Sequence, residues 1–143
     1  MSRSPIPHEM RGSTEYKLCR GCAEWHPLAK SFYRSKRERD GFQPKCKTCS
    51  REAIRCAELK RLYGISREQY LDMMLAQGGV CVVCQEACAR GGELSVDHNH
   101  ETGEVRALLC RACNSALGLL REDPERMIAM IDYLGADVPK RIR

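Results

Sequence analysis

Residues 94–114 read LSVDHNHETGEVRALLCRACN and hold much of the polar chemistry of the chain. Leu94 to His98 alternates apolar and polar residues, which is typical of a half-buried strand. Glu101-Thr102-Gly103 predicts a turn, and Glu104 to Leu109 predicts the returning strand. Residues 110–120 then predict a helix that begins at a pair of cysteines. The stretch therefore predicts a β-hairpin followed directly by a helix.

The cysteines form two similar arrangements. Two Cys-x2-Cys pairs separated by 23 residues are followed by two more pairs separated by 25 residues. This spacing is typical of two tetrahedral zinc sites. The predicted ligands are Cys19, Cys22, Cys46 and Cys49 for the first site, and Cys81, Cys84, Cys110 and Cys113 for the second. Four thiolates leave no open position for water, so both sites are expected to be structural.

Two other uses of the cysteines are open. A finger with two Cys and two His ligands would take His98 and His100, but such histidines usually lie about four or five positions apart. Disulfides would suit an extracellular chain, yet the sequence opens without an apolar signal segment. It also has no run near the roughly 18 apolar residues that span a bilayer. We therefore expect a soluble cytoplasmic protein with reduced thiols and no membrane partner, in which Cys56 and Cys88 are unassigned.

Polar residues between the Cys pairs of the second site can carry chemistry. Closing this site should bring Asn114, which directly follows Cys113, close to the hairpin. Asp97 and Asn114 could then supply oxygen ligands to Mg²⁺ or Mn²⁺. His98 could act as general base on a water, because an imidazole can take up a proton near neutral pH. His100 could contact the scissile phosphate or orient the metal ligands.

Each of these residues also has a purely structural interpretation. Asp97 and Asn99 are common turn residues, and Asn114 could cap a helix. His98 could be a hydrogen-bonded structural histidine. The combination favours the chemical interpretation, because two pairs of zinc ligands would hold the whole group in one geometry.

A basic segment precedes this unit. Between Lys30 and Arg61 there are 11 Lys and Arg against 4 Asp and Glu, a local charge of +7, while the whole chain carries +5. A solvated surface and a DNA-binding face both fit this charge, and Lys and Arg can neutralise phosphates without reading sequence. The predicted DNA contacts are Arg34, Lys36, Arg37, Arg39, Lys45, Lys47 and Arg106. Phe32, Tyr33 and Phe42 are expected to fill the small module, with base stacking as the alternative.

Three further helices are expected. The first is a basic helix over residues 50–62. Ser66 and Gln69 form a capping box for the second, whose apolar face begins at Tyr70 and which Gly78-Gly79 ends. The third begins at Asp123-Pro124. Its apolar stripe is expected to complete the core, with a partner surface as the alternative. The stripe consists of Met127, Met130, Ile131 and Leu134.

The pattern CVVC…VDHNHETGEVRALLCRACN resembles the recombination endonuclease VII family, a branch of the HNH or ββα-metal nucleases. The resemblance covers roughly Gln69 to Leu134, with the two Cys pairs, Asp-His-x-His, Gly-x-Val-Arg and Cys-Asn in the same order. The front segment KLCRGC…FYRSKRERDGFQPKCKTC is similar to smaller phage and bacterial relatives. One departure is Leu117, which stands where the best-known member has an acidic residue.

The resemblance implies a small α+β fold, in which a ββα-metal nuclease unit sits on a four-cysteine zinc site. A zinc-ribbon-like module and linking helices would precede it. Asp97 and Asn114 would hold the metal, His98 would be the base, and His100 would be a further contact. The implied activity is Mg²⁺-dependent DNA cleavage, of branched DNA such as Holliday junctions, in phage recombination or packaging. The alternatives are a nicking or homing HNH endonuclease and a non-catalytic zinc DNA-binding protein.

The expected organisation has four parts, and the protein would work in the cytoplasm of a phage host or bacterium, with a homodimer as one option. A flexible arm covers residues 1–15, and the zinc module with its basic helix covers residues 16–64. The nuclease domain covers residues 65–136, and a basic tail covers residues 137–143.

Overall fold

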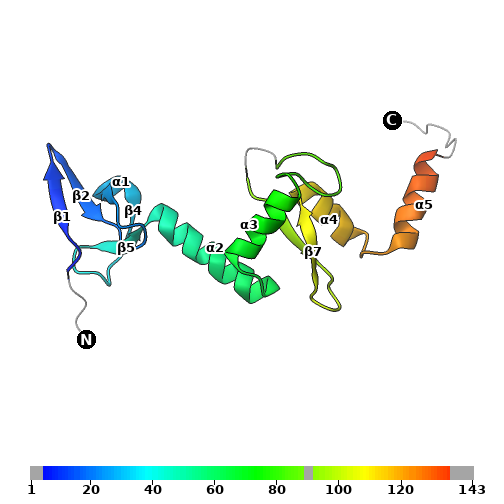
Figure 1. Ribbon diagram of the computed structural model, residues 1–143, viewed down its shortest axis with the longest axis horizontal. Helices are drawn as coiled ribbons and strands as arrows, with labels where there is room; N and C mark the ends of the chain where they lie inside the picture. Colours follow the sequence, from blue (N-terminus) through cyan, green and yellow to red (C-terminus); the bar gives the residue numbers. More distant parts are fainter. Residues whose placement is uncertain (1–4, 89–91, 136–143) are drawn as a thin grey trace. The chain divides into compact units, whose positions relative to one another are not determined.

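The computed structural model describes residues 5–88 and 92–135. The chain divides into two compact units, residues 1–67 and residues 68–143, and each is described by itself. Figure 1 traces their elements in chain order. The four-part organisation expected from the sequence stays a prediction, and its basic tail over residues 137–143 lies outside the described residues.

The first unit opens with a three-stranded antiparallel sheet. Its strands are β1 (His8–Arg11), β2 (Thr14–Leu18) and β3 (Trp25–Pro27), in that order. Gly12, with a φ of +60°, allows the tight turn between β1 and β2. All four residues of β1 have partners in β2. Residues 8–11, which lie within the flexible arm predicted over residues 1–15, are therefore paired in a sheet.

A second sheet and a short helix complete the core of this unit. The helix α1 (Leu28–Ser31) precedes strand β4 (Phe32–Arg34), which pairs with β5 (Phe42–Cys46). The buried cluster is small and consists of Cys19, Leu28, Phe32 and Cys46, with Phe42 and Cys49 packed against it. The two phenylalanines thus fill the module, while Tyr33 is 42% exposed. So small an apolar core needs another source of stability, and the cysteines can supply it through a metal.

Lys17 is a fully buried cation that the sequence pattern did not indicate. Its Nζ donates to the backbone oxygens of Phe42 and Gln43, both at 3.0 Å, and lies 2.6 Å from the Asp40 carboxylate. Burial alone would raise the pKa of Asp40. Hydrogen bonds from Lys17, from the Phe42 backbone and from His8 outweigh burial and leave that pKa below its ordinary value. Lys17 therefore ties β2 to the β4–β5 connection.

We expect Lys17→Ala to destabilise the zinc-loaded chain by about 2 kcal/mol, because it leaves two carbonyls and a carboxylate without their donor. Urea unfolding measures this loss. Lys36→Ala, at an exposed lysine of the same unit, is the matched control and should change stability by less than about 0.5 kcal/mol.

The loss should also depend on pH. The ionised Asp40 carboxylate stabilises the fold above the pKa that Asp40 has in the unfolded chain, and this stabilisation is lost as the pH falls through the lower pKa of the folded chain. The difference in unfolding free energy between wild type and Lys17→Ala should therefore shrink in acid. Equal losses of stability in Lys17→Ala and Lys36→Ala would contradict the role of Lys17.

Helix α2 (Lys47–Tyr63) contains the expected basic helix and begins three residues earlier. The earlier start follows from Cys46, whose sulfur accepts the backbone N–H of Cys49 and caps the helix. Gly64 ends the helix in the left-handed conformation with φ of +71°, and its N–H returns to the carbonyl of Lys60.

The second unit contains the expected hairpin and helix. Strand β6 (Ser95–His98) pairs with β7 (Val105–Leu109) in an antiparallel sheet, and α4 (Arg111–Leu119) follows. The turn is set by Asn99, whose Oδ1 accepts the backbone N–H groups of Glu101 and Thr102 at 2.8 and 3.1 Å. The ββα arrangement within a small α+β fold confirms the predicted fold class.

Helix α3 (Arg67–Ala76) is joined to the hairpin by two specific contacts. The hydroxyl of the fully buried Tyr70 donates to the Leu94 carbonyl at 2.8 Å. The Gln77 amide, just beyond the helix, exchanges hydrogen bonds with the backbone N–H and carbonyl of Leu108 at 2.8 and 2.9 Å. The buried residues of this unit are Tyr70, Cys81, Leu94, Val96, Asp97, Leu108 and Leu109.

The apolar stripe of the last helix does not complete the core. Helix α5 (Pro124–Gly135) begins where predicted, with Asp123 Oδ1 accepting the N–H of Glu125 at 2.9 Å. None of its described residues is buried, and Ile131 and Leu134 are 67% and 81% exposed. The expectation was wrong because helical periodicity defines an apolar face but not what covers it. Within the part of the chain that the structure describes, no helix is both long and apolar enough to cross a bilayer.

Candidate active site and metal centres

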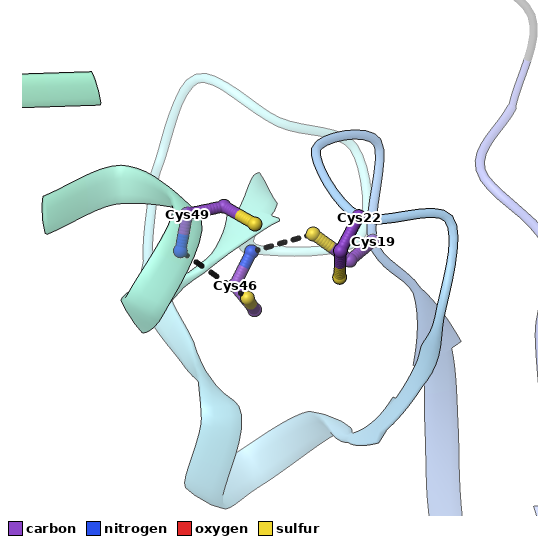
Figure 2. Close-up of side chains that lie close together, drawn as sticks. All are labelled: Cys19, Cys22, Cys46 and Cys49. Atoms are coloured by element: carbon purple, nitrogen blue, oxygen red, sulfur yellow. Dashed lines mark hydrogen bonds between the residues drawn. The ribbon is translucent and has the colours of Figure 1, made fainter. Parts of the chain in front are cut away.

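The first four-cysteine cluster joins a loop, a strand end and a helix start. Cys19 and Cys22 lie in the loop after β2, Cys46 ends β5, and Cys49 lies in the first turn of α2 (Figure 2). The sulfur atoms lie within 4.8 Å of one another. The backbone N–H of Cys46 donates to the sulfur of Cys19 at 3.1 Å, and that of Cys49 donates to the sulfur of Cys46 at 3.5 Å. Bonds of this kind favour thiolate over thiol.

The negative charges of four thiolates in this cluster require a compensating cation. Burial raises the pKa of Cys19, but backbone hydrogen bonds outweigh burial and lower it to about 6. Burial first, and then the neighbouring cysteines, raise the pKa of Cys49 to about 12. Four thiolates can therefore coexist at neutral pH only when a cation compensates them. Gly21 keeps the space open, because a Cβ there would lie 2.7 Å from the Cβ of Cys49.

The second cluster has the same construction. Cys81 and Cys84 lie in the loop before β6, whereas Cys110 and Cys113 stand at the start of α4, and their sulfurs lie within 4.8 Å of one another. Burial raises the pKa of Cys81, but backbone hydrogen bonds lower it to about 6. A hydrogen bond with Cys110, followed by burial, raises the pKa of Cys113 to about 12. The cluster uses four cysteines, so the alternative finger with two histidine ligands is not what the structure has.

Both clusters are compatible with zinc and not with disulfides. All ten cysteines are free thiols. The sulfurs of Cys84 and Cys110 lie 3.8 Å apart, whereas a disulfide requires about 2.05 Å. The unassigned Cys56 and Cys88 lie outside the clusters, with their sulfurs near Glu52 at 3.8 Å and the Glu93 carbonyl at 3.5 Å.

Asp97 and His98 lie at a β-bulge. The register between β6 and β7 shifts between these two residues, and such bulges commonly redirect side chains beside active sites. The buried Asp97 carboxylate accepts two hydrogen bonds from Arg106, from Nε at 2.7 Å and from Nη2 at 3.0 Å. Arg106, which was predicted to contact DNA, thus has its guanidinium bound to the carboxylate that was predicted to bind metal.

Glu122 is a site residue that sequence reasoning missed. Its carboxylate contacts the His100 ring and accepts a hydrogen bond from Arg106 Nη1 at 2.9 Å. The hydrogen bonds from Arg106 first, and then from His100, lower the pKa of Glu122, while Asp97 and then Glu122 raise the pKa of Arg106. Arg121 and Glu122 both have positive φ, 57° and 56°, which costs of order 1–3 kcal/mol for each such residue. No sequence signal marks Glu122, because this left-handed turn between α4 and α5 is what points it back to the hairpin.

The remaining predicted residues lie around the same hairpin. The rings of His98 and His100 are 4.7 Å apart between centroids. Asn114 lies in α4, which packs against both β6 and β7. It does not cap the helix, since Cys110 has that role. Among residues 5–88 and 92–135, the Asn114 side chain has no hydrogen-bond partner, so its amide oxygen is available as a ligand.

The chemistry of the Asp97 and Asn114 side chains suits a hard divalent cation. A carboxylate and an amide oxygen are the ligand types that Mg²⁺ and Mn²⁺ accept. The Asp97 carboxylate is nearly buried and already has a cation, the Arg106 guanidinium, as its partner. The environment of Asp97 therefore accommodates a positive charge, and the side-chain chemistry of the two predicted ligands fits such an ion.

The basic residues of the first unit lie on and beside its second sheet. Arg34, Lys36, Arg37, Arg39 and Lys45 are exposed, and Lys47 is half-buried. The guanidinium of Arg34 lies 5.1 Å from the centre of the Phe42 ring, and the Lys47 ammonium lies 5.6 Å from that of Tyr33. These contacts align cationic groups with ring faces while leaving them accessible to an anion.

Comparisons with known proteins identify a family and similar proteins. The profile of a protein family described as "Recombination endonuclease VII" matches residues 56–136. The "Gene 59 protein" of Mycobacterium phage D29 is 42% identical over 99 residues, which cover 64% of this chain and 60% of the relative. The "Gene 59 protein" of Mycobacterium phage L5 is 35% identical over 142 residues, which cover 92% of this chain and 82% of the relative.

Among solved structures, the chain is similar to the crystal structure of the beta-beta-alpha-Me type II restriction endonuclease Hpy99I. The TM-score is 0.38 and the identity 25%, covering 84% of this chain and 65% of that one. The chain thus spans less than two thirds of the length of the D29 relative and of this restriction endonuclease.

Proposed function

Because this chain belongs to the recombination endonuclease VII family, we propose that it is a metal-dependent endonuclease that hydrolyses phosphodiester bonds in DNA. One observation carries the proposal. The matched residues 56–136 include the bulge at Asp97 and His98, the helix with Asn114, and all four cysteines of the second cluster. A zinc DNA-binding module without catalysis would not need this polar group.

In the proposed mechanism, Asp97 and Asn114 hold Mg²⁺ or Mn²⁺, and the two four-cysteine clusters hold structural Zn²⁺. When bound, the divalent ion polarises the phosphoryl oxygen and stabilises the leaving oxygen. His98 takes a proton from the water that attacks phosphorus, as the bond from phosphorus to the leaving oxygen breaks. His100 contacts the scissile phosphate, and Glu122 orients the His100 ring.

Branched DNA is the substrate that we propose within this activity. The family description names recombination, and the curated relatives are phage proteins. We accordingly place the protein in the host cytoplasm, where thiolates stay reduced. Symmetric cuts across a Holliday junction need two sites related by a two-fold axis, so this activity requires a homodimer. A nicking endonuclease is the second candidate, because each chain has one set of Asp97, His98 and Asn114 and one such set cuts one strand.

The test compares linear, nicked and four-way DNA, each incubated with Mg²⁺ in the presence and absence of EDTA. We expect four-way DNA to be cut fastest and EDTA to stop all cleavage. Equal cleavage of all three substrates by a monomer would identify the nicking activity instead. No cleavage by zinc-loaded protein in Mg²⁺ or Mn²⁺ would reject the endonuclease. The molar mass in solution, measured by light scattering, decides between monomer and dimer.

The exposed basic residues of the first unit are proposed as the DNA-binding surface. Changing Arg34, Lys36, Arg37 and Arg39 together to alanine should weaken binding to all sequences, because phosphate contacts carry no sequence information. The plot of log affinity against log salt concentration should become shallower by about 0.9 for each phosphate that the variant no longer neutralises. Fluorescence anisotropy across a salt titration measures both effects. Two bound zinc ions per chain would confirm that the variant is folded, and unchanged affinity and slope would remove these residues from the interface.

A further inference from the structure

Arg106 and a divalent ion would compete for the Asp97 carboxylate. Both of its oxygens accept hydrogen bonds from Arg106, and the carboxylate is nearly buried. The ion of the proposed function would need the same oxygens. A guanidinium left beside a divalent ion in such a poorly solvated place would also repel it. The Arg106 guanidinium therefore opposes metal binding as long as it stays on Asp97.

Glu122 gives the displaced guanidinium a second partner. Arg106 uses Nε and Nη2 for Asp97, with Nη2 also donating to the His98 carbonyl at 3.2 Å, but it uses Nη1 for Glu122. The bond to Glu122 can therefore persist when those of Nε and Nη2 break. On this side of the hairpin lies a cavity of about 470 Å³, lined by Asn99, Arg106, Gly118 and Glu122 among others. Arg106 and Glu122 both line this cavity, and the left-handed turn at Arg121 and Glu122 brings the second carboxylate to it.

We propose that Arg106 and Glu122 form a latch over the metal site: Arg106 occupies Asp97 until a divalent ion displaces it, and Glu122 retains the released guanidinium. The proposal rests on the proposed function, because it takes Asp97 as a metal ligand. Arg106 and Glu122 are positioning residues here, and neither contacts the ion. Arg106 therefore lowers the affinity of the site for the ion, because it must be displaced from Asp97. Glu122 makes this loss of affinity smaller, because it pairs with the displaced guanidinium.

The test measures Mn²⁺ binding to the zinc-loaded full chain without DNA, by electron paramagnetic resonance of free Mn²⁺. Asp97→Asn defines the specific site and should abolish it. Arg106→Ala should bind Mn²⁺ about tenfold more tightly, the scale of one charge-assisted pair. Unfolding cannot produce such a gain. Arg126→Ala removes the same charge from an ion pair with Asp123 and is the matched control, with a change of no more than about twofold at moderate salt.

The Glu122 variants test the second half of the latch. Glu122→Ala should weaken Mn²⁺ binding, because the released guanidinium then has no second carboxylate to pair with. In the Arg106→Ala background the same change should have no effect, since nothing remains for Glu122 to retain. A weakening that persists in this background would make Glu122 a direct ligand and overturn the latch. If Arg106→Ala fails to retain two zinc ions, Arg106→Lys replaces it, and should also tighten binding because an ammonium cannot form the two-pronged contact.

The outcomes distinguish a failure of the latch from a failure of the proposed metal site. If Asp97→Asn removes Mn²⁺ binding while Arg106→Ala leaves the affinity unchanged or weaker, the latch is wrong and the proposed metal site stands. If Asp97→Asn binds Mn²⁺ as well as the wild type does, the proposed metal site is wrong and the latch falls with it.

Discussion

Replacing His98 by alanine is expected to lower the rate of DNA cleavage by about 10³-fold, within the range that a general base contributes. His98 stands at the bulge beside Asp97, with its ring next to that of His100. It belongs to neither cysteine cluster, so its loss should leave two zinc ions bound. DNA affinity should also stay unchanged, because the proposed binding surface lies in the first unit.

Three measurements make this result specific. Single-turnover cleavage in Mg²⁺ gives the chemical rate, elemental analysis gives the zinc content, and binding in EDTA gives the DNA affinity. Added imidazole should restore part of the activity of His98→Ala, because a small base can occupy the space that the side chain leaves. A variant that cuts DNA at nearly the wild-type rate would show that another group is the base.

Replacing Cys110 by serine is expected to unfold the second unit. Cys110 is a member of the second cluster, and its sulfur also caps α4 by accepting the backbone N–H of Cys113 at 3.4 Å. The substitution therefore removes a metal ligand at the start of the helix with Asn114, while the serine hydroxyl can still cap that helix. Structural zinc contributes about 10–16 kcal/mol in small domains, which is as large as the whole free energy of unfolding of a typical domain, roughly 5–15 kcal/mol.

Cys88→Ser is the matched control, since Cys88 lies in the same unit but outside the cluster. For Cys110→Ser, we expect the zinc content to fall from two ions to one, and limited proteolysis to cut within residues 68–135. For Cys88→Ser, both readouts should match the wild type. A Cys110→Ser protein that keeps two zinc ions and resists the protease would refute the structural role of this cluster.

Short-range patterns in the sequence were sufficient for the hairpin, the Cys-x2-Cys pairs and the starts of α3, α4 and α5. The Cys-x2-Cys spacing places two sulfurs and their backbone N–H donors on one tight turn, whatever surrounds it. Asn99 and Gly103 specify the hairpin turn within five residues, and Asp123 caps α5 through its own neighbours. All of these features depend on hydrogen bonds or ligands that lie close together in the chain, and such bonds can be predicted from local residue types.

Only the tertiary structure decided which distant charges meet. Lys17 is paired with Asp40 inside the first unit, although it looks like a surface residue of a polar strand. Arg106 faces Asp97 and Glu122, because the bulge in β6 and two left-handed residues after α4 bring the three together. The apolar stripe of α5 likewise did not determine whether another element covers the helix or leaves it exposed. Long-range pairings follow from how turns orient whole elements, and residue type alone does not encode that orientation.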